Sequence, residues 1–287
     1  LNAQLASIGH IYCETRLHAS SGLDGLWNER LNGISQKPFL TNLLEQDPDQ
    51  LYFALVRLKE RLIQHSDLHL AVSGISPAVA TRFFIPRRLG DQTNKAKPFS
   101  NLPLKEGIPT AASNFTLGQA VSVGAPAPSQ VVARMLETGW LWDSIRVAGG
   151  AYSTRCRYNA NDGLLTLLSI RDPNSLTTLD RFGEAPIWLE HNASGDLLNR
   201  CMKATASNLA RAERPDDLVA VALQHHLRGE TDEMRAADLD NVCSVTASMV
   251  REATQRMAAS LPHARTVILG PKHKLCLALK NRPDAFE

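Results

Sequence analysis

Two side chains that could act on a peptide lie on either side of a glycine pair. Arg146 ends a helical pattern, Gly149 and Gly150 stop that helix, and Tyr152 opens the strand that follows. A guanidinium can bind a peptide carboxylate or carbonyl through its fork of donors. A phenol can donate a hydrogen bond to the oxyanion that forms when a peptide bond is hydrolysed. The spacing therefore predicts one cationic and one phenolic group held beside a single turn.

The same two residues also fit a purely structural interpretation. An arginine in the last turn of a helix is stabilised by the helix dipole. A tyrosine on a strand is an ordinary core residue with a polar tip. The residue types and their spacing leave both interpretations open.

Other catalytic signatures are missing from the sequence. It contains no G-x-S-x-G, Walker A, G-x-G-x-x-G, C-x-x-C or H-E-x-x-H segment, and no inverted H-x-x-E-H. His65 and His69 have no glutamate in the metalloprotease position, and the adjacent His225 and His226 point about 100° apart on a helix. We therefore expect this chain to bind no metal by itself.

Composition narrows the class of protein. The 31 Lys and Arg against 29 Asp and Glu give a net charge of +2, which favours neither nucleic acid nor an anionic membrane as partner. No apolar run reaches the roughly 18 residues that a membrane span needs. The five cysteines are scattered without metal or redox spacing, so we expect free thiols in a reducing intracellular compartment. Because Leu1 falls within a helical pattern, the chain reads as part of a longer one.

The elements around the glycine pair indicate an α+β fold. Residues 1–65 are helical in pattern and 68–72 alternate like a strand, so we expect a domain boundary near residue 66. Residues 84–109 are rich in Pro, Gly, Asn and Lys and predict an exposed loop. Further strands are predicted at 115–123, 151–158, 164–170 and 266–269, the middle two joined by an Asp-Gly turn.

Helices fill the rest of the pattern. A helix capped by Ser129 is predicted to run to about Ile145, and residues 174–261 predict about four helices. The last is long, with Val242 and Met257 on its buried face. The predicted fold is an antiparallel-containing sheet with helices packed on one face, preceded by a helical segment.

One segment resembles a known family. R-V-x-G-G-A-Y (Arg146–Tyr152), between Trp142-Asp143 and the S-x-R-D-P-N run at 169–174, resembles the C-terminal half of pitrilysin-type (inverzincin) zinc metallopeptidases. It is most similar to the presequence-protease and falcilysin-like subgroup. Upstream segments look like the closing helices of that family's third domain and the first strands of its fourth: 9–12, 16–20, 31–35, 39–40, 68–74, 107–110 and 114–115.

The resemblance implies a zinc metalloendopeptidase that degrades short unstructured peptides, such as cleaved targeting peptides. Residues 1–66 would close the third domain and 67–287 would form the fourth. The N-terminal half of the same polypeptide would bind the zinc. Tyr152 would hydrogen-bond the scissile carbonyl, Arg146 would hold the substrate, and Gly149, Gly150 and Ala151 would let the peptide approach. Alone, this chain would be inactive.

The resemblance leaves a second function open, and the sequence differs from the family's pattern at one place. Relatives of this fold serve as non-catalytic scaffold or substrate-presenting subunits of heteromeric complexes, although retention of Arg146 and Tyr152 favours the enzyme. Ser153, Thr154 and Arg155 follow the tyrosine where the family more often has small residues, so we expect a changed substrate preference. The resemblance implies a mitochondrial or plastid matrix, with a peptide substrate and no nucleic acid or membrane as partner.

Overall fold

The structure is a computed structural model that describes residues 2–65, 71–74, 76, 79, 102–211, 214 and 217–286. The chain divides into two units: Leu1–Lys37, Ala96–Asn208 and Asp240–Glu287 form one, and Pro38–Lys95 with Leu209–Leu239 form the other. The boundary that we predict at residue 66, and most of the strand predicted at 68–72, lie outside the described residues.

A five-stranded mixed sheet forms the centre of the first unit, in the order β1-β5-β2-β4-β3. Strand β1 (Lys105–Pro109) runs parallel to β5 (Arg265–Gly270), and every other neighbouring pair is antiparallel. The remaining strands are β2 (Phe115–Ser122), β4 (Leu164–Asp172) and β3 (Ser153–Asn159). The predicted hairpin is β3–β4, and the α+β fold class is confirmed.

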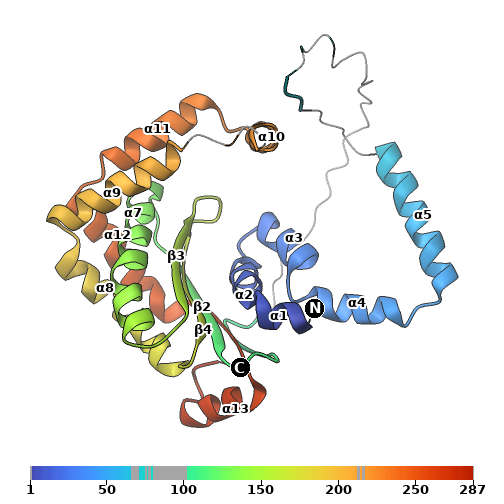
Figure 1. The fold of residues 1–287 in the computed structure, drawn as a ribbon, viewed down its shortest axis with the longest axis horizontal. Coiled ribbons are helices and arrows are strands. Elements are labelled where there is room, and N and C mark those ends of the chain that lie inside the picture. The colour runs from blue at the N-terminus through green and yellow to red at the C-terminus, as the bar shows by residue number, and fades with distance from the viewer. Residues whose placement is uncertain are drawn as a thin grey trace. The chain divides into compact units, whose positions relative to one another are not determined.

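Helices α7 (Pro126–Thr138), α8 (Leu176–Asn192) and α12 (Ala247–Ser260) cover one face of this sheet (Figure 1). Leu117 on β2 and Leu167 on β4 point into that layer and are fully buried, as alternation along a strand requires. They meet the helix side chains in one apolar core whose largest buried member is Phe182.

The opposite face of the sheet carries α2 (Gly9–His18), which adds a second helical layer to the arrangement that we predict. Leu17 of α2 joins Ala120 and Leu168 of the strands in a separate core. The helix lies close because position 118 of β2 is glycine. A Cβ there would come within 2.8 Å of the Leu17 side chain and 2.7 Å of the Leu168 side chain, closer than side chains pack.

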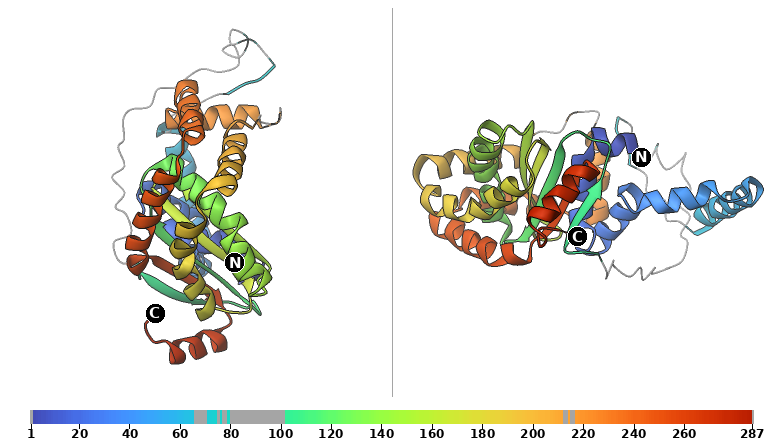
Figure 2. Two further views of the ribbon diagram at one scale, coloured as in Figure 1. Left: turned by 90° about the vertical axis from the view of Figure 1, so that its left-hand side faces the viewer. Right: turned by 90° about the horizontal axis from the view of Figure 1, so that it is seen from below.

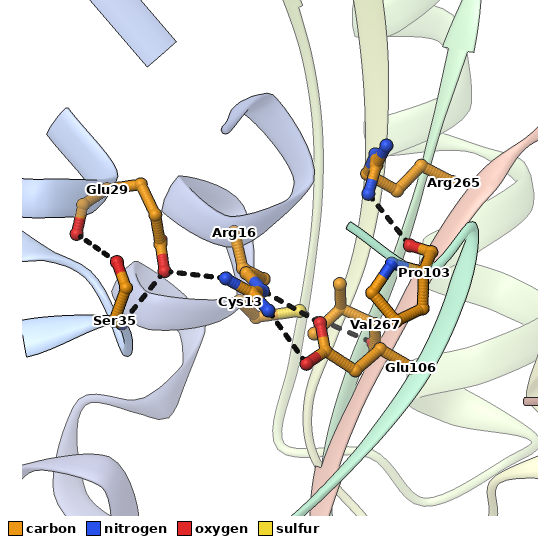
Figure 3. Close-up of polar contacts among 8 residues, drawn as sticks. All are labelled: Cys13, Arg16, Glu29, Ser35, Pro103, Glu106, Arg265 and Val267. Atoms are coloured by element: carbon orange, nitrogen blue, oxygen red, sulfur yellow. Dashed lines mark hydrogen bonds and ion pairs between the residues drawn. The ribbon is translucent and has the colours of Figure 1, made fainter. Parts of the chain in front are cut away.

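Arg16 of α2 joins three elements through buried ion pairs (Figure 3). Its guanidinium donates to Glu29 on α3 (Leu23–Asn32) at 3.0 Å and to Glu106 on β1 at 2.7 Å. Glu29 also accepts the backbone N–H of Ser35 at 3.0 Å. Burial disfavours the charge on Arg16, but the two carboxylates raise its pKa above the ordinary value. Paired charges therefore hold α2 and α3 against the sheet.

The end of α2 is also tied to the β3–β4 turn. His18 Nδ1 lies 2.5 Å from Asp162 Oδ2 and its Nε2 lies 2.9 Å from Thr166 Oγ1, while Ser21 donates to the same carboxylate at 2.8 Å. Burial acts to raise the pKa of Asp162, but bonding to His18 and Ser21 lowers it overall.

The remaining helices complete the two units. Helix α13 (Lys272–Asn281), red in Figure 2, follows β5 and contacts β1. The first unit also contains α1 (Asn2–Ser7), all of α9 (Gly195–Leu209) except its last residue, and the turn η2 (Leu261–His263). The second unit contains most of α4 (Gln36–Leu44), α5 (Pro48–His65) and α10 (Leu218–Arg228), and α11 (Asp232–Cys243) passes from one unit to the other.

Several predicted element boundaries are wrong. Strand β1 occupies the end of the predicted loop at 84–109, of which residues 84–101 lie outside the described part. Helix α7 begins at Pro126, and Ser129 donates to the carbonyl of Ala125 at 2.7 Å instead of capping a helix. The predicted long last helix is two, since α11 ends at Cys243 and Thr246 caps α12 by accepting the Met249 N–H.

Candidate functional site

Arg146 lies in a π-helical segment, η1 (Trp142–Val147), that follows α7 after Gly139. The predicted continuous helix to Ile145 is therefore two segments with different hydrogen bonding. The Arg146 guanidinium carbon lies 3.9 Å from the centroid of the Trp142 ring, so the cation stacks on the indole. A stacked guanidinium keeps its N–H donors pointing outward in its own plane, where they remain able to bind a carbonyl or carboxylate.

The glycine pair forms the turn that we predict after this segment. The N–H of Gly150 donates to the carbonyl of Arg146 at 3.1 Å, and Ala151 donates to Ile145 at 3.2 Å. Gly150 has φ +78°, a conformation that favours glycine. At Gly149 a Cβ would meet the Ile145 carbonyl oxygen at 2.6 Å. Both glycines are thus needed for the turn itself, and the Ala151 methyl is buried in the core.

Tyr152 follows directly and continues the pairing of β3 with β4. Its N–H donates to the carbonyl of Ile170 at 3.1 Å, one residue before β3 formally begins. The side chain is 66% exposed, and its hydroxyl makes no hydrogen bond to any described residue. The backbone is therefore fixed by the sheet while the phenol remains available to a ligand.

Arg171 is a residue of this corner to which our sequence analysis gives no role. Its guanidinium carbon lies 5.2 Å from the centroid of the Tyr152 ring, a cation–π distance. Its φ is +51°, and it is the non-glycine residue with positive φ in the described chain. Such conformations cost of order 1–3 kcal/mol and persist where surrounding structure imposes them.

Asp172 supplies that surrounding structure. Its carboxylate is fully buried and accepts the hydroxyls of Ser169 at 2.5 Å and Thr178 at 2.8 Å, and the N–H of Asn174 at 2.8 Å. Burial raises the pKa of Asp172 although all three donors oppose that shift. The Asn174 side chain donates in turn to the carbonyl of Gly149 at 2.8 Å. The strand end and the glycine turn are therefore one connected network.

A shallow hollow of about 400 Å³ lies beside the turn. Among the predicted site residues only Gly149 lines it; Arg146, Gly150, Ala151 and Tyr152 do not. Its other walls come from η1 and the residue after it, from the β4–α8 connection and from the first turns of α8: Ser144, Ala148, Pro173, Asn174, Thr177, Thr178 and Arg181. The sequence does not predict this hollow, because its lining residues form no catalytic or metal-binding motif.

A zinc site requires several His, Cys, Asp or Glu side chains close together. Nowhere in the described ranges do three His, Cys, Asp or Glu side chains gather as metal ligands. His225 lies 2.5 Å from Glu230 in a local pair within the second unit. The described residues thus offer no set of zinc ligands. No helix in the described part combines the length and apolar character of a membrane span.

Comparison with known proteins finds a family whose match to this chain includes this corner. Residues 116–253 match the family described as "PreP C-terminal domain", and that range contains Arg146, the glycine pair, Tyr152 and the Arg171-Asp172 strand end. The resemblance to pitrilysin-type presequence proteases is confirmed, and the chain is a relative of that group.

Individual relatives match between about half and nearly all of this chain. "Presequence protease 1, chloroplastic/mitochondrial" of Arabidopsis thaliana is 23% identical over 301 aligned residues, which cover 99% of this chain and 28% of that protein. "Presequence protease, mitochondrial" of Xenopus laevis is 31% identical over 150 residues, 52% of this chain and 14% of that protein. Among solved structures, a conserved protein from Enterococcus faecalis V583 matches with a TM-score of 0.49 at 12% identity, over 69% of this chain and 50% of that one. This chain therefore spans little more than a quarter of the first relative's length.

Proposed function

We propose that this chain supplies the substrate-binding half of the active site of a zinc metalloendopeptidase that degrades short unstructured peptides, such as cleaved targeting peptides. The relatives' names support the reaction class, since they are presequence proteases. We further propose that the zinc site lies in an N-terminal half of the same polypeptide, and that the protein works in a mitochondrial or plastid matrix, as those names state for the relatives.

Tyr152 is the proposed catalytic residue of this chain. The phenol would donate a hydrogen bond to the carbonyl oxygen of the scissile bond and hold it as negative charge develops there. The observation that carries this role is an exposed hydroxyl without a bonding partner in the described chain, on a backbone fixed by β4. Because β4 fixes the Tyr152 backbone, the donor would need only a side-chain rotation to reach the oxyanion.

Arg146 is the proposed substrate-holding residue. Its stacking on Trp142 limits the rotamers of a long side chain, so less entropy is lost when the guanidinium binds a peptide. Gly149 and Gly150 leave the rim of the turn without side chains, which would let the peptide backbone approach.

Peptide hydrolysis by the full-length polypeptide, compared between wild type and Tyr152→Phe at matched zinc content, tests the proposal. We expect kcat to fall about 10²-fold, the usual effect of removing one oxyanion donor, with KM nearly unchanged. Tyr158→Phe is the matched control. Its hydroxyl donates to the Gly124 carbonyl at 2.8 Å and lies outside the proposed site, so kcat should stay at the wild-type value.

Two results would contradict the proposal. Equal kcat in wild type and Tyr152→Phe would make the tyrosine structural while leaving the peptidase in place. No hydrolysis by either protein, with zinc bound, would favour the scaffold or substrate-presenting subunit.

A further inference from the structure

Strand β4 contains a β-bulge beside the residue that we propose as catalytic. Its register against β2 shifts between Phe115 and Leu117, where β4 has one residue more than β2. The residues of β4 at this shift are Ile170 and Arg171. The N–H of Tyr152 donates to the carbonyl of Ile170 at 3.1 Å, so the bulge and the proposed catalytic residue are direct neighbours. Bulges are over-represented next to active sites, where the extra residue re-aims a side chain.

The side chain that this bulge re-aims is that of Arg171. Alternation along a regular strand would direct position 171 to the same face as Leu165 and Leu167, which are fully buried in the core under the helices. Arg171 is exposed instead, and its guanidinium carbon lies 5.2 Å from the centroid of the Tyr152 ring. The positive φ of Arg171, +51°, belongs to this irregularity. The bulge therefore brings a cation to the phenol.

An arginine at this position carries backbone strain that glycine would not. The adjacent Asp172, which accepts three hydrogen bonds in the core, holds the strand end and so imposes the conformation. A bulge alone would be better served by glycine, so what arginine adds is its side chain. None of the ion pairs among the described residues includes Arg171. Its contact in that part of the chain is the Tyr152 ring.

The Tyr152 ring needs such a partner to have a defined orientation. The backbone is fixed by β4, but the side chain is 66% exposed, so the sheet alone leaves its χ angles free. A guanidinium over the face of a ring is attracted to it electrostatically and is itself planar, so the contact favours a limited set of ring orientations. A donor with fewer orientations to choose from loses less entropy when it meets the oxyanion.

We propose that Arg171 is a positioning residue of the active site. Its strained conformation in the bulge places a guanidinium on the Tyr152 ring and thereby orients the phenol for the scissile carbonyl. Arg171 acts through Tyr152 and not on the side chains of the peptide, so it sets no requirement on the charge of the substrate. This inference rests on the proposed function and deepens it by adding a residue to the same site.

A double-mutant cycle in the full-length polypeptide tests whether Arg171 acts through the tyrosine hydroxyl. Arg171→Met keeps an apolar stem and removes the guanidinium. It should lower kcat for peptide hydrolysis roughly fivefold with KM nearly unchanged, as expected from one partly exposed cation–π contact. In the Tyr152→Phe background the same substitution should change kcat less than about twofold, because phenylalanine keeps the ring and has no donor to orient. Arg171→Lys, which keeps a cation for the ring, should recover part of the loss.

Arg171→Gly separates positioning from folding. Glycine adopts positive φ without strain, so Tm should stay close to or above the wild-type value while kcat falls as it does in Arg171→Met. Arg157→Met is the matched control, because it removes an exposed arginine from the same hairpin. Its kcat and KM should stay at the wild-type values.

Fluorine NMR of a 3-fluorotyrosine placed at position 152 alone reports on the ring without any hydrolysis. Because the guanidinium lies over that ring, the fluorine signal should shift in Arg171→Met and in Arg171→Gly. It should stay in place in Arg157→Met.

An equal fold-loss of kcat from Arg171→Met in both backgrounds would overturn the positioning role. So would wild-type kcat in folded Arg171→Gly, or a fluorine signal that stays in place when Arg171 is replaced. A full-length polypeptide that hydrolyses no peptide would contradict the proposed function. The fluorine signal would still show whether Arg171 orients the ring, so the two failures are distinguishable.

Discussion

Arg16→Met should destabilise the sheet-containing unit strongly, because it leaves a carboxylate buried without its counter-ion. Methionine keeps the apolar stem of the arginine and removes only the charge and its donors. Arg16 Nη1 lies 3.0 Å from Glu29 Oε1, and the Glu29 side chain is 0% exposed. Without Arg16, the Glu29 carboxylate would keep one hydrogen-bond donor among the described residues, the Ser35 N–H at Oε1. Its other oxygen, Oε2, is buried and has no hydrogen-bond partner among them.

The cost of leaving one partner of a buried ion pair unpaired sets the magnitude of the loss. A buried carboxylate without its counter-ion costs about 3–5 kcal/mol, so we expect a loss of that size at pH 7.

Urea unfolding followed by tryptophan fluorescence measures this loss in the relevant unit. All 4 tryptophans (Trp27, Trp140, Trp142 and Trp188) lie within it. Glu29→Gln in the Arg16→Met background should recover part of the loss, because it removes the buried charge. Arg134→Met, which breaks a half-exposed pair with Glu137 at 3.5 Å, is the control and should cost less than about 1 kcal/mol. A loss below about 1 kcal/mol for Arg16→Met, or no recovery when Glu29→Gln is added, would refute the reasoning.

Three further predictions concern the other buried contacts. Asp162 has a pKa lowered by its bond to His18 against the effect of burial, so its stabilisation is present above the ordinary pKa of 3.8 and is lost as the pH falls through the folded pKa. Asp162→Asn should therefore flatten the fall of Tm with acid below about pH 4, and an unchanged acid limb would contradict the pairing. In the native protein, a thiol reagent should react only with the exposed Cys243 and Cys276. Burial shields the thiols of Cys13, Cys156 and Cys201 from the reagent and raises their pKa values. Rapid reaction of a third cysteine would contradict this prediction. Gly118→Ala should cost about 1–3 kcal/mol in urea unfolding by forcing α2 off the sheet, and wild-type stability would mean that the two leucines move aside.

Local pattern was sufficient for much of the sheet. The sequence predicts β2, β3, β4 and β5 each within a few residues, because each is a short segment rich in apolar residues and an Asp-Gly pair marks the hairpin. β1 was not, because its Lys, Gly and Pro have low strand propensity and the strand exists through its parallel pairing with β5. Pairing between segments distant in sequence is invisible to local periodicity.

Helix ends were predicted less well than helix existence. Apolar spacing continues from Val242 through Val245 into α12, so periodicity alone predicts one helix across the break at Thr246. Thr246 is a favourable N-cap residue, but the apolar spacing continues across it, so periodicity alone does not mark the break. At the other end, α7 begins at Pro126, three residues before the predicted cap Ser129, because proline is favoured in the first turn of a helix, where its missing N–H costs nothing.

The candidate site could be predicted in part. The turn between Arg146 and Tyr152 follows from paired glycines, which local sequence shows directly. The stacking of Arg146 on Trp142 depends on a π-helical segment, and the place of Arg171 depends on a positive φ held by buried Asp172. Neither feature has a local signature, so residues that are ordinary in sequence acquire their position from the packed structure.

The connected network also decides how a Tyr152 variant is to be interpreted. The Tyr152 hydroxyl bonds to no described residue, whereas its backbone is held by β4 and its ring lies against Arg171. Phenylalanine keeps the ring, so it keeps the contact with Arg171 and loses only the donor. A fall in kcat with unchanged Tm would then report on the donor, because the structure has no folding role for that hydroxyl. Asp172→Ala would have the opposite effect: it would release Arg171 and the Gly149 turn together, lowering Tm before chemistry could be assessed.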